Sequence, residues 1–298
     1  MSMRRTLRPV AFLAVSLVLA GSAGSTASVQ DQWPAGLYMG QTVGRALGGT
    51  IGAMQDNSDL GFHSGICLFG TCVEQEKAAL APISLEKDVD YLFVGACDED
   101  ASDVRIRVLD ADEAELAAED EPGQIGALAF TPESDGDYWV EIGLPDAKSP
   151  AFCALAILAA GGVRVSQDAL FATADAFSKY AEGLRAKVPD LAFHSGENEW
   201  GLLGAVAAEG EMVGLAGLAY NGTTHIFGAA AGAGVTGTKL SLADADGNAL
   251  EEAEQADEAV VTFSHETEED AEYQLILEGA TADPPGFVFI SVLESKGN

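Results

Sequence analysis

The chain has 298 residues, 48% of them hydrophobic, and carries 47 acidic side chains against 15 lysines and arginines, a formal net charge of −32. A field this negative repels nucleic acids and anionic lipid surfaces, so we expect no nucleic-acid partner. The apolar fraction is too high for a disordered acidic tail, and the length allows two domains of ordinary size.

Residues 1–27 are predicted to be a signal peptide. Arg4, Arg5 and Arg8 precede an apolar run at 10–20 that is too short to span a bilayer, and small residues suited to cleavage follow it. The alternative is a short membrane anchor. No later apolar run reaches the roughly 18 residues of a membrane helix, so the mature form is predicted to be periplasmic or secreted and not membrane-spanning.

A first helix is predicted from Asp31, with Pro34 in its first turn. Glycine recurs at every fourth position of this helix: Gly36, Gly40, Gly44, Gly48 and Gly52. Each glycine costs a helix about 0.8–1 kcal/mol relative to alanine, so five of them need a packing reason. Close packing within the fold is the first reading, self-association through this glycine ridge is the second, and membrane insertion is the third.

The loop after this helix reveals an internal repeat. The stretch DLGFHSG at residues 59–65 recurs as DLAFHSG at residues 190–196. The similarity continues downstream with few gaps, and it predicts two copies of one module, residues 31–162 and 163–298.

The repeated loop carries an acid, a histidine and a hydroxyl in each copy. These residues are Asp59, His63 and Ser64 in the first copy and Asp190, His194 and Ser195 in the second. A nucleophile–base–acid set is one reading, although neighbouring side chains rarely converge in that geometry. A structural loop, in which Asp and Ser cap backbone groups, is the favoured interpretation.

The following segment is predicted to form short strands. Apolar residues alternate with polar ones at 104–108 and 138–142, and nearly continuous apolar runs at 91–94 and 152–158 are typical of central strands. Between the strands, Asp98, Asp100 and Asp103 crowd one loop, where carboxylate oxygens could bind Ca²⁺. The second copy has glycines there, so any calcium site is expected in the first copy alone; no other cofactor is expected.

The second copy opens with a clearer helix. Ser166 is its predicted N-cap, an apolar stripe follows, and Pro189 ends it. Turn signals lie at Asn221-Gly222 and at residues 246–248. The sequence therefore predicts a mainly β protein with helices: two tandem jelly-roll-like β-sandwich domains, each preceded by one amphipathic helix.

Part of the first copy resembles the bacterial pre-peptidase C-terminal (PPC) family. The likeness lies in YLFVG at 91–95, DVRIRVLD at 103–110, FTP at 130–132 and GDY at 136–138. The second copy keeps it less well. The resemblance implies a β-sandwich that accompanies secreted enzymes or stands alone in exported proteins, and it implies no catalysis.

Four cysteines in an exported chain permit disulfides. Cys97 and Cys153 have apolar counterparts in the second copy, which predicts that they face each other in the core and are bonded. Cys67 and Cys72 then pair locally. The rival pairings are Cys67–Cys97 with Cys72–Cys153, and Cys67–Cys153 with Cys72–Cys97.

The function predicted from these features is an exported, non-catalytic binding or structural protein whose ligand is an unknown protein or polysaccharide. The alternative is a secreted hydrolase, or an accessory subunit of one, because PPC-like modules accompany such enzymes. No catalytic residue is assigned.

Overall fold

The computed structural model describes residues 34–119, 121–147, 150–195, 199–207, 212–220, 222–232, 234–255, 259–268, 271–278, 280 and 282–295. The predicted signal peptide at 1–27 and Asn221 of one predicted turn lie outside this set. Within it, no helix is both long and apolar enough to cross a membrane.

The first half of the chain begins with a helix and continues in strands. Its elements are α1 (Pro34–Asp56), β1 (Leu60–Phe62), β2 (Ile66–Val73), β3 (Ala78–Leu85), β4 (Tyr91–Cys97), β5 (Arg105–Leu109), β6 (Glu115–Glu119), β7 (Ile125–Phe130), β8 (Gly136–Gly143) and β9 (Ala151–Ala160).

The second half follows the same order of elements. They are α2 (Gln167–Arg185), β10 (Leu191–Phe193), β11 (Leu202–Ala207), β12 (Val213–Ala219), β13 (Thr224–Ala231), β14 (Lys239–Asp244), β15 (Ala249–Glu254), β16 (Val260–Glu266), β17 (Glu272–Glu278) and β18 (Gly286–Ser295). The prediction of a mainly β protein with helices is confirmed.

The two halves have the same strand order. The first half orders its strands β2-β9-β4-β7 in one sheet and β3-β8-β5-β6 in another, and the second half orders them β11-β18-β13-β16 and β12-β17-β14-β15. Each strand of the second half therefore occupies the place of a strand in the first. The division into two domains at 162/163 stays a prediction.

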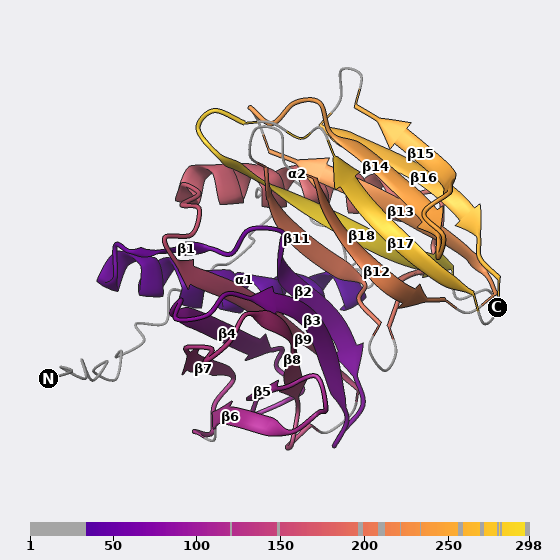
Figure 1. Cartoon of the computed structure of the whole chain (residues 1–298). Helices are drawn as coiled ribbons and strands as arrows, with labels where there is room; N and C mark the ends of the chain where they lie inside the picture. The colour runs from indigo at the N-terminus through magenta and orange to yellow at the C-terminus, as the bar shows by residue number, and fades with distance from the viewer. Residues whose placement is uncertain are drawn as a thin grey trace, which may run out of the picture.

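The halves are joined through one continuous sheet. Strands β2 and β11 pair antiparallel, with Gly70 opposite Leu202 and Leu68 opposite Gly204, so that a ten-stranded sheet crosses the whole molecule. Figure 1 shows the indigo-to-magenta half below the orange-to-yellow half, with β2 and β11 where they meet. The repeat pattern gave no indication of this pairing.

The central strands of the ten-stranded sheet are buried on both faces. Along β9, Cys153, Leu155 and Ile157 face the core beneath the two four-stranded sheets, while Ala154 and Leu158 face the core beneath the helices. The layers are thus two helices, the long sheet, and a pair of four-stranded sheets. Burial on both faces explains why the central strands are continuous apolar runs.

Each helix is fastened to the sheet by an equivalent hydrogen bond. The hydroxyl of Thr42 in α1 lies 3.3 Å from the carbonyl oxygen of Phe152, and that of Thr173 in α2 lies 2.8 Å from the carbonyl oxygen of Phe287. The predicted N-cap is confirmed, since the Ser166 side chain accepts a hydrogen bond from the Ala169 amide at 3.2 Å.

Helix α1 contributes buried apolar side chains to the core beneath the helices, among them Met39, Val43 and Leu47. Gly44 is buried, whereas a Cβ on Gly52 would meet nothing within 4 Å. Self-association through the ridge stays a prediction.

Candidate functional site: a buried cluster of two histidines and a glutamate

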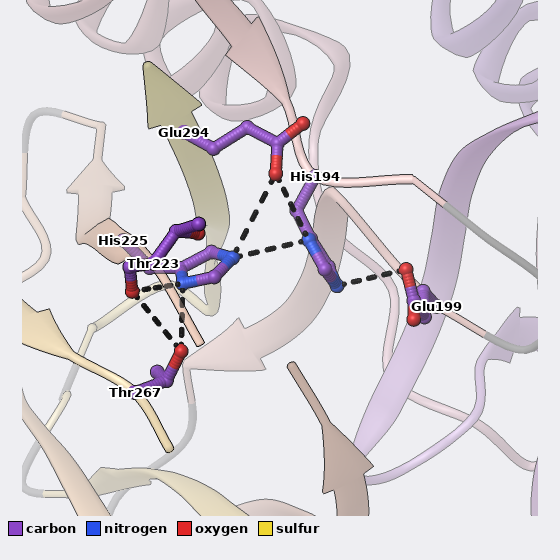
Figure 2. Close-up of polar contacts among 6 residues, drawn as sticks. All are labelled: His194, Glu199, Thr223, His225, Thr267 and Glu294. Atoms are coloured by element: carbon purple, nitrogen blue, oxygen red, sulfur yellow. Dashed lines mark hydrogen bonds and ion pairs between the residues drawn. The ribbon is translucent and has the colours of Figure 1, made fainter. Parts of the chain in front are cut away.

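A polar cluster lies inside the second half, where three strands bring two histidines and a glutamate together (Figure 2). His194 directly follows β10, His225 lies in β13 and Glu294 lies near the end of β18. Strand pairing sets their positions, because His225 is the register partner of Glu294 and β10 pairs with the same end of β18. The side chains of the two histidines are 1% and 0% exposed, and that of Glu294 is 12% exposed.

One side-chain atom of each of these three residues, able to act as a metal ligand, points toward the same place. His194 Nδ1 lies 3.2 Å from His225 Nε2 and 3.5 Å from Glu294 Oε2. His225 Nε2 lies 3.8 Å from the same carboxylate oxygen. Each residue thus presents one donor atom toward a common point.

The outward nitrogen of His225 is held in place. Its Nδ1 lies 3.1 Å from the carbonyl oxygen of Thr223 and 3.2 Å from the hydroxyl of Thr267. A carbonyl oxygen only accepts hydrogen bonds, so Nδ1 carries the proton in the neutral ring. The lone pair of His225 therefore lies on Nε2, which faces the cluster.

The outward nitrogen of His194 faces a second carboxylate. His194 Nε2 lies 3.1 Å from Glu199 Oε2, a charge contact rather than a well-aligned hydrogen bond. A carboxylate behind the ring orients a metal-binding histidine and raises its basicity. Both histidines therefore have the outer partner that such ligands normally have.

The surroundings shift the pKa values of the two histidines in opposite directions. Burial alone would lower the pKa of His194, but its interactions with Glu199 and Glu294 outweigh burial and raise that pKa above its usual value. Burial lowers the pKa of His225, and the neighbouring His194 lowers it further. The two carboxylates thus favour the protonated form of His194, while burial favours the neutral form of His225.

Tyr220 closes the cluster on one side. Its ring centroid lies 4.9 Å from the ring centroids of both His194 and His225. Its hydroxyl is buried and has no hydrogen-bond partner among the described residues. A buried polar atom without a partner is typical of places where an ion or an ordered water belongs.

The equivalent place in the first half lacks the cluster. The strand registers put His63 where the second half has His194, Tyr91 where it has His225, and Ala159 where it has Glu294. His63 packs against Tyr91 with ring centroids 5.8 Å apart, and burial lowers the pKa of His63. The first half therefore has one of the three potential metal ligands, a histidine, and lacks the second histidine and the glutamate.

The structure separates the residues of the predicted repeated site. The carboxylate of Asp190 accepts a hydrogen bond from Ser295 at 2.8 Å, and Ser195 is half-buried. In the first half, Asp59 and Ser64 are exposed. His194 is the one member that joins the cluster, and its partners are His225 and Glu294, which the sequence analysis did not select.

The predicted calcium ligands make local hydrogen bonds. One oxygen of Asp98 accepts from the Asp100 amide at 2.9 Å, and the other accepts from the Phe152 amide at 2.8 Å. Asp103 accepts from the Gly123 amide at 2.9 Å. Three backbone donors thus engage this loop, and calcium binding by it stays a prediction.

The cysteines correct the sequence-based pairing. None of the four forms a disulfide in the part of the chain that the structure describes. Cys67 and Cys72 lie on the single extended strand β2, which separates their Cα atoms by about 16 Å, far beyond the limit of about 7 Å for a disulfide. That pairing was wrong.

Cys97 and Cys153 are direct register partners on β4 and β9, both buried, as the sequence predicted for their positions. The bond between them is nevertheless not formed in this structure. Burial raises the pKa of Cys97 to about 12, so it packs as a neutral thiol. Neutral thiols are the unreactive form in disulfide chemistry.

The sequence matches no protein-family model, and a search of curated proteins finds no match. The PPC resemblance therefore stays a prediction.

Solved structures offer only distant similarities. A Clostridium perfringens ZmpB structure with an M60 catalytic domain and two CBM51 domains is 11% identical, with a TM-score of 0.24, over 79% of this chain and 36% of that one. The Paenibacillus barcinonensis Xyn10C CBM22 tandem is 11% identical, with a TM-score of 0.21, over 81% and 94%. Pseudomonas aeruginosa PA5104 is 15% identical, with a TM-score of 0.20, over 79% and 99%. Scores this low carry no argument about function.

Proposed function

We propose that this protein is an exported, non-catalytic metal-binding protein that holds one divalent transition metal, zinc in the first place. The ligands are His194 Nδ1, His225 Nε2 and Glu294 Oε2. The observation that carries the proposal is their convergence, with donor atoms 3.2, 3.5 and 3.8 Å apart. Export is supported by the signal peptide predicted at residues 1–27.

The spacing suits a tetrahedral ion. Zinc–nitrogen and zinc–oxygen bonds of about 2.0–2.2 Å put tetrahedral ligands about 3.3–3.5 Å apart, close to the three separations. Two imidazole nitrogens and one carboxylate oxygen are ligands of intermediate softness. Such a ligand set favours zinc and other late first-row metals over calcium or magnesium. The fourth position would be taken by water.

The same ligand set also serves catalytic zinc, which keeps the secreted hydrolase as the second candidate. Catalysis requires a substrate to reach the metal. The two histidine side chains are 1% and 0% exposed, so the site favours metal retention over turnover. The unknown protein or polysaccharide ligand predicted from the sequence stays a prediction.

Titration calorimetry of the chelator-stripped protein with zinc chloride tests the proposal. We expect one zinc per chain. His225→Gln and Glu294→Gln each remove a ligand and should weaken binding by more than about 100-fold, because changes even to outer partners cost 10–100-fold.

Two matched controls should bind like the wild type. His63→Gln removes the equivalent histidine of the first half, and Ser195→Ala removes a half-buried hydroxyl of the repeated loop that is not part of the cluster. The proposal fails if the wild type binds no zinc, or if both ligand variants retain wild-type affinity.

A further inference from the structure

The outer face of the four-stranded sheet in the first half carries a short row of apolar side chains. In β8, Tyr138 and Val140 are buried in the core, so Trp139 between them faces outward. Its register partners are Pro82 in β3 and Leu109 in β5. Register partners share one face of a sheet, so these three side chains form a row across three strands.

Paired polar groups border this row on both sides. On one side, the hydroxyl of Ser84 donates to the carboxylate of Asp137 at 2.6 Å. On the other, the guanidinium of Arg107 donates two hydrogen bonds to the carboxylate of Glu141, at 2.7 and 2.5 Å. Asp137 and Glu141 lie two residues before and after Trp139 on the same strand, so the apolar row is one residue wide. It is far smaller than a standard protein interface, which buries about 800 Å² on each partner.

Trp139 is the open part of the row. Its side chain is half-buried, and it makes no hydrogen bond or ring contact with any residue that the structure describes. The indole N–H, which only donates, is therefore left for a ligand. The side chain of Arg107 is 30% exposed, and its guanidinium has N–H groups beyond those that bond carboxylates.

The equivalent face of the second half lacks these groups. The strand registers put Gln274 of β17 where the first half has Trp139, and Ser241 of β14 where it has Arg107. The aromatic ring and the guanidinium are thus both confined to the first half. The second half supplies a matched control position on the same kind of sheet.

We propose that this outer face, with Pro82, Trp139 and Arg107, binds a neutral polysaccharide. A sugar ring has an apolar C–H face and a rim of hydroxyls. The C–H face suits the electron-rich face of an aromatic ring, here Trp139, and the hydroxyls accept from the indole N–H and from Arg107. A net charge of −32 repels anionic polymers, and Arg107 is already balanced by Glu141, so the face fits an uncharged ligand.

Native gel electrophoresis of the full chain, in gels that contain laminarin, dextran or galactomannan and with chelator present, tests the proposal. We expect at least one of these neutral polysaccharides to retard the wild type, and anionic alginate to leave its mobility unchanged. Trp139→Ala should weaken binding more than about 10-fold, because tryptophans often dominate binding energy. Trp139→Tyr keeps a ring and should bind better than Trp139→Ala. Gln274→Ala is the matched control and should behave like the wild type.

The contrary outcomes are equally definite. The proposal is overturned if none of the three neutral polysaccharides retards the wild type, or if folded Trp139→Ala is retarded as strongly as the wild type. If sedimentation velocity shows a dimer that Trp139→Ala dissociates, the face is a contact between copies of the chain, and the polysaccharide proposal is wrong. Because the metal is absent from these gels, none of these results depends on zinc binding.

Discussion

The two halves of the molecule share a strand order but differ at equivalent buried positions. Where the second half places His225 and Glu294 as register partners, the first half places Tyr91 and Ala159. A histidine follows the short strand in both halves. The comparison teaches that the fold supplies the positions, and that two side chains decide whether a polar cluster with three converging ligand atoms exists there.

The largest expected effect on stability comes from substitutions in the β2–β11 strand pair, where the two halves meet. Equivalent glycines in these two strands have different surroundings. A Cβ on Gly204 would lie 2.6 Å from the Phe287 ring and 2.8 Å from Leu68 Cβ, whereas one on Gly70 would meet the flexible Met39 sulfur at 3.0 Å. We expect Gly204→Ala to lower the free energy of unfolding by about 3 kcal/mol, and Gly70→Ala by less than about 1 kcal/mol. Chemical denaturation measures both; equal effects would contradict the asymmetry.

The next prediction builds the missing ligands into the first half. Tyr91→His with Ala159→Glu would give His63 two partners at the equivalent positions. We expect a second, weaker zinc equivalent by calorimetry, about 10–100-fold below the native site, because the grafted site lacks the outer partners of its histidines. Tyr91→His alone is the control.

If the folded double variant still binds only one zinc, position and side-chain identity do not suffice. The outer contacts of Glu199 and Thr223 would then be essential parts of the site. Circular dichroism before the titration shows whether the variant is folded.

The sequence predicted the helices and strands better than it predicted which strands pair with each other. The periodicity around Ser166 located α2 and its cap, and alternation located β5 and β8, because these signals are local. The pairing of β2 with β11 depends on which edges meet, and apolar periodicity does not encode that. The Cys67–Cys72 pair was what remained after Cys97 was paired with Cys153, and the extended strand β2 forbids it.

The cluster of His194, His225 and Glu294 escaped prediction for the same reason. His194 was selected because its loop repeats, but its partners were sought within that loop. His225 and Glu294 come from distant strands, and pairing with β18 brings them together. The sequence did contain a usable signal. At the two positions where the second copy has His225 and Glu294, the first copy has Tyr91 and Ala159, so both positions differ in residue type between the copies.

Anomalous diffraction at the zinc absorption edge, from crystals grown with one equivalent of zinc, tests the central claim most directly. The account predicts one strong peak per chain, about 2.0–2.2 Å from His194 Nδ1, His225 Nε2 and Glu294 Oε2. No peak should appear beside His63. A peak at another set of side chains, with none between His194 and His225, would contradict the account.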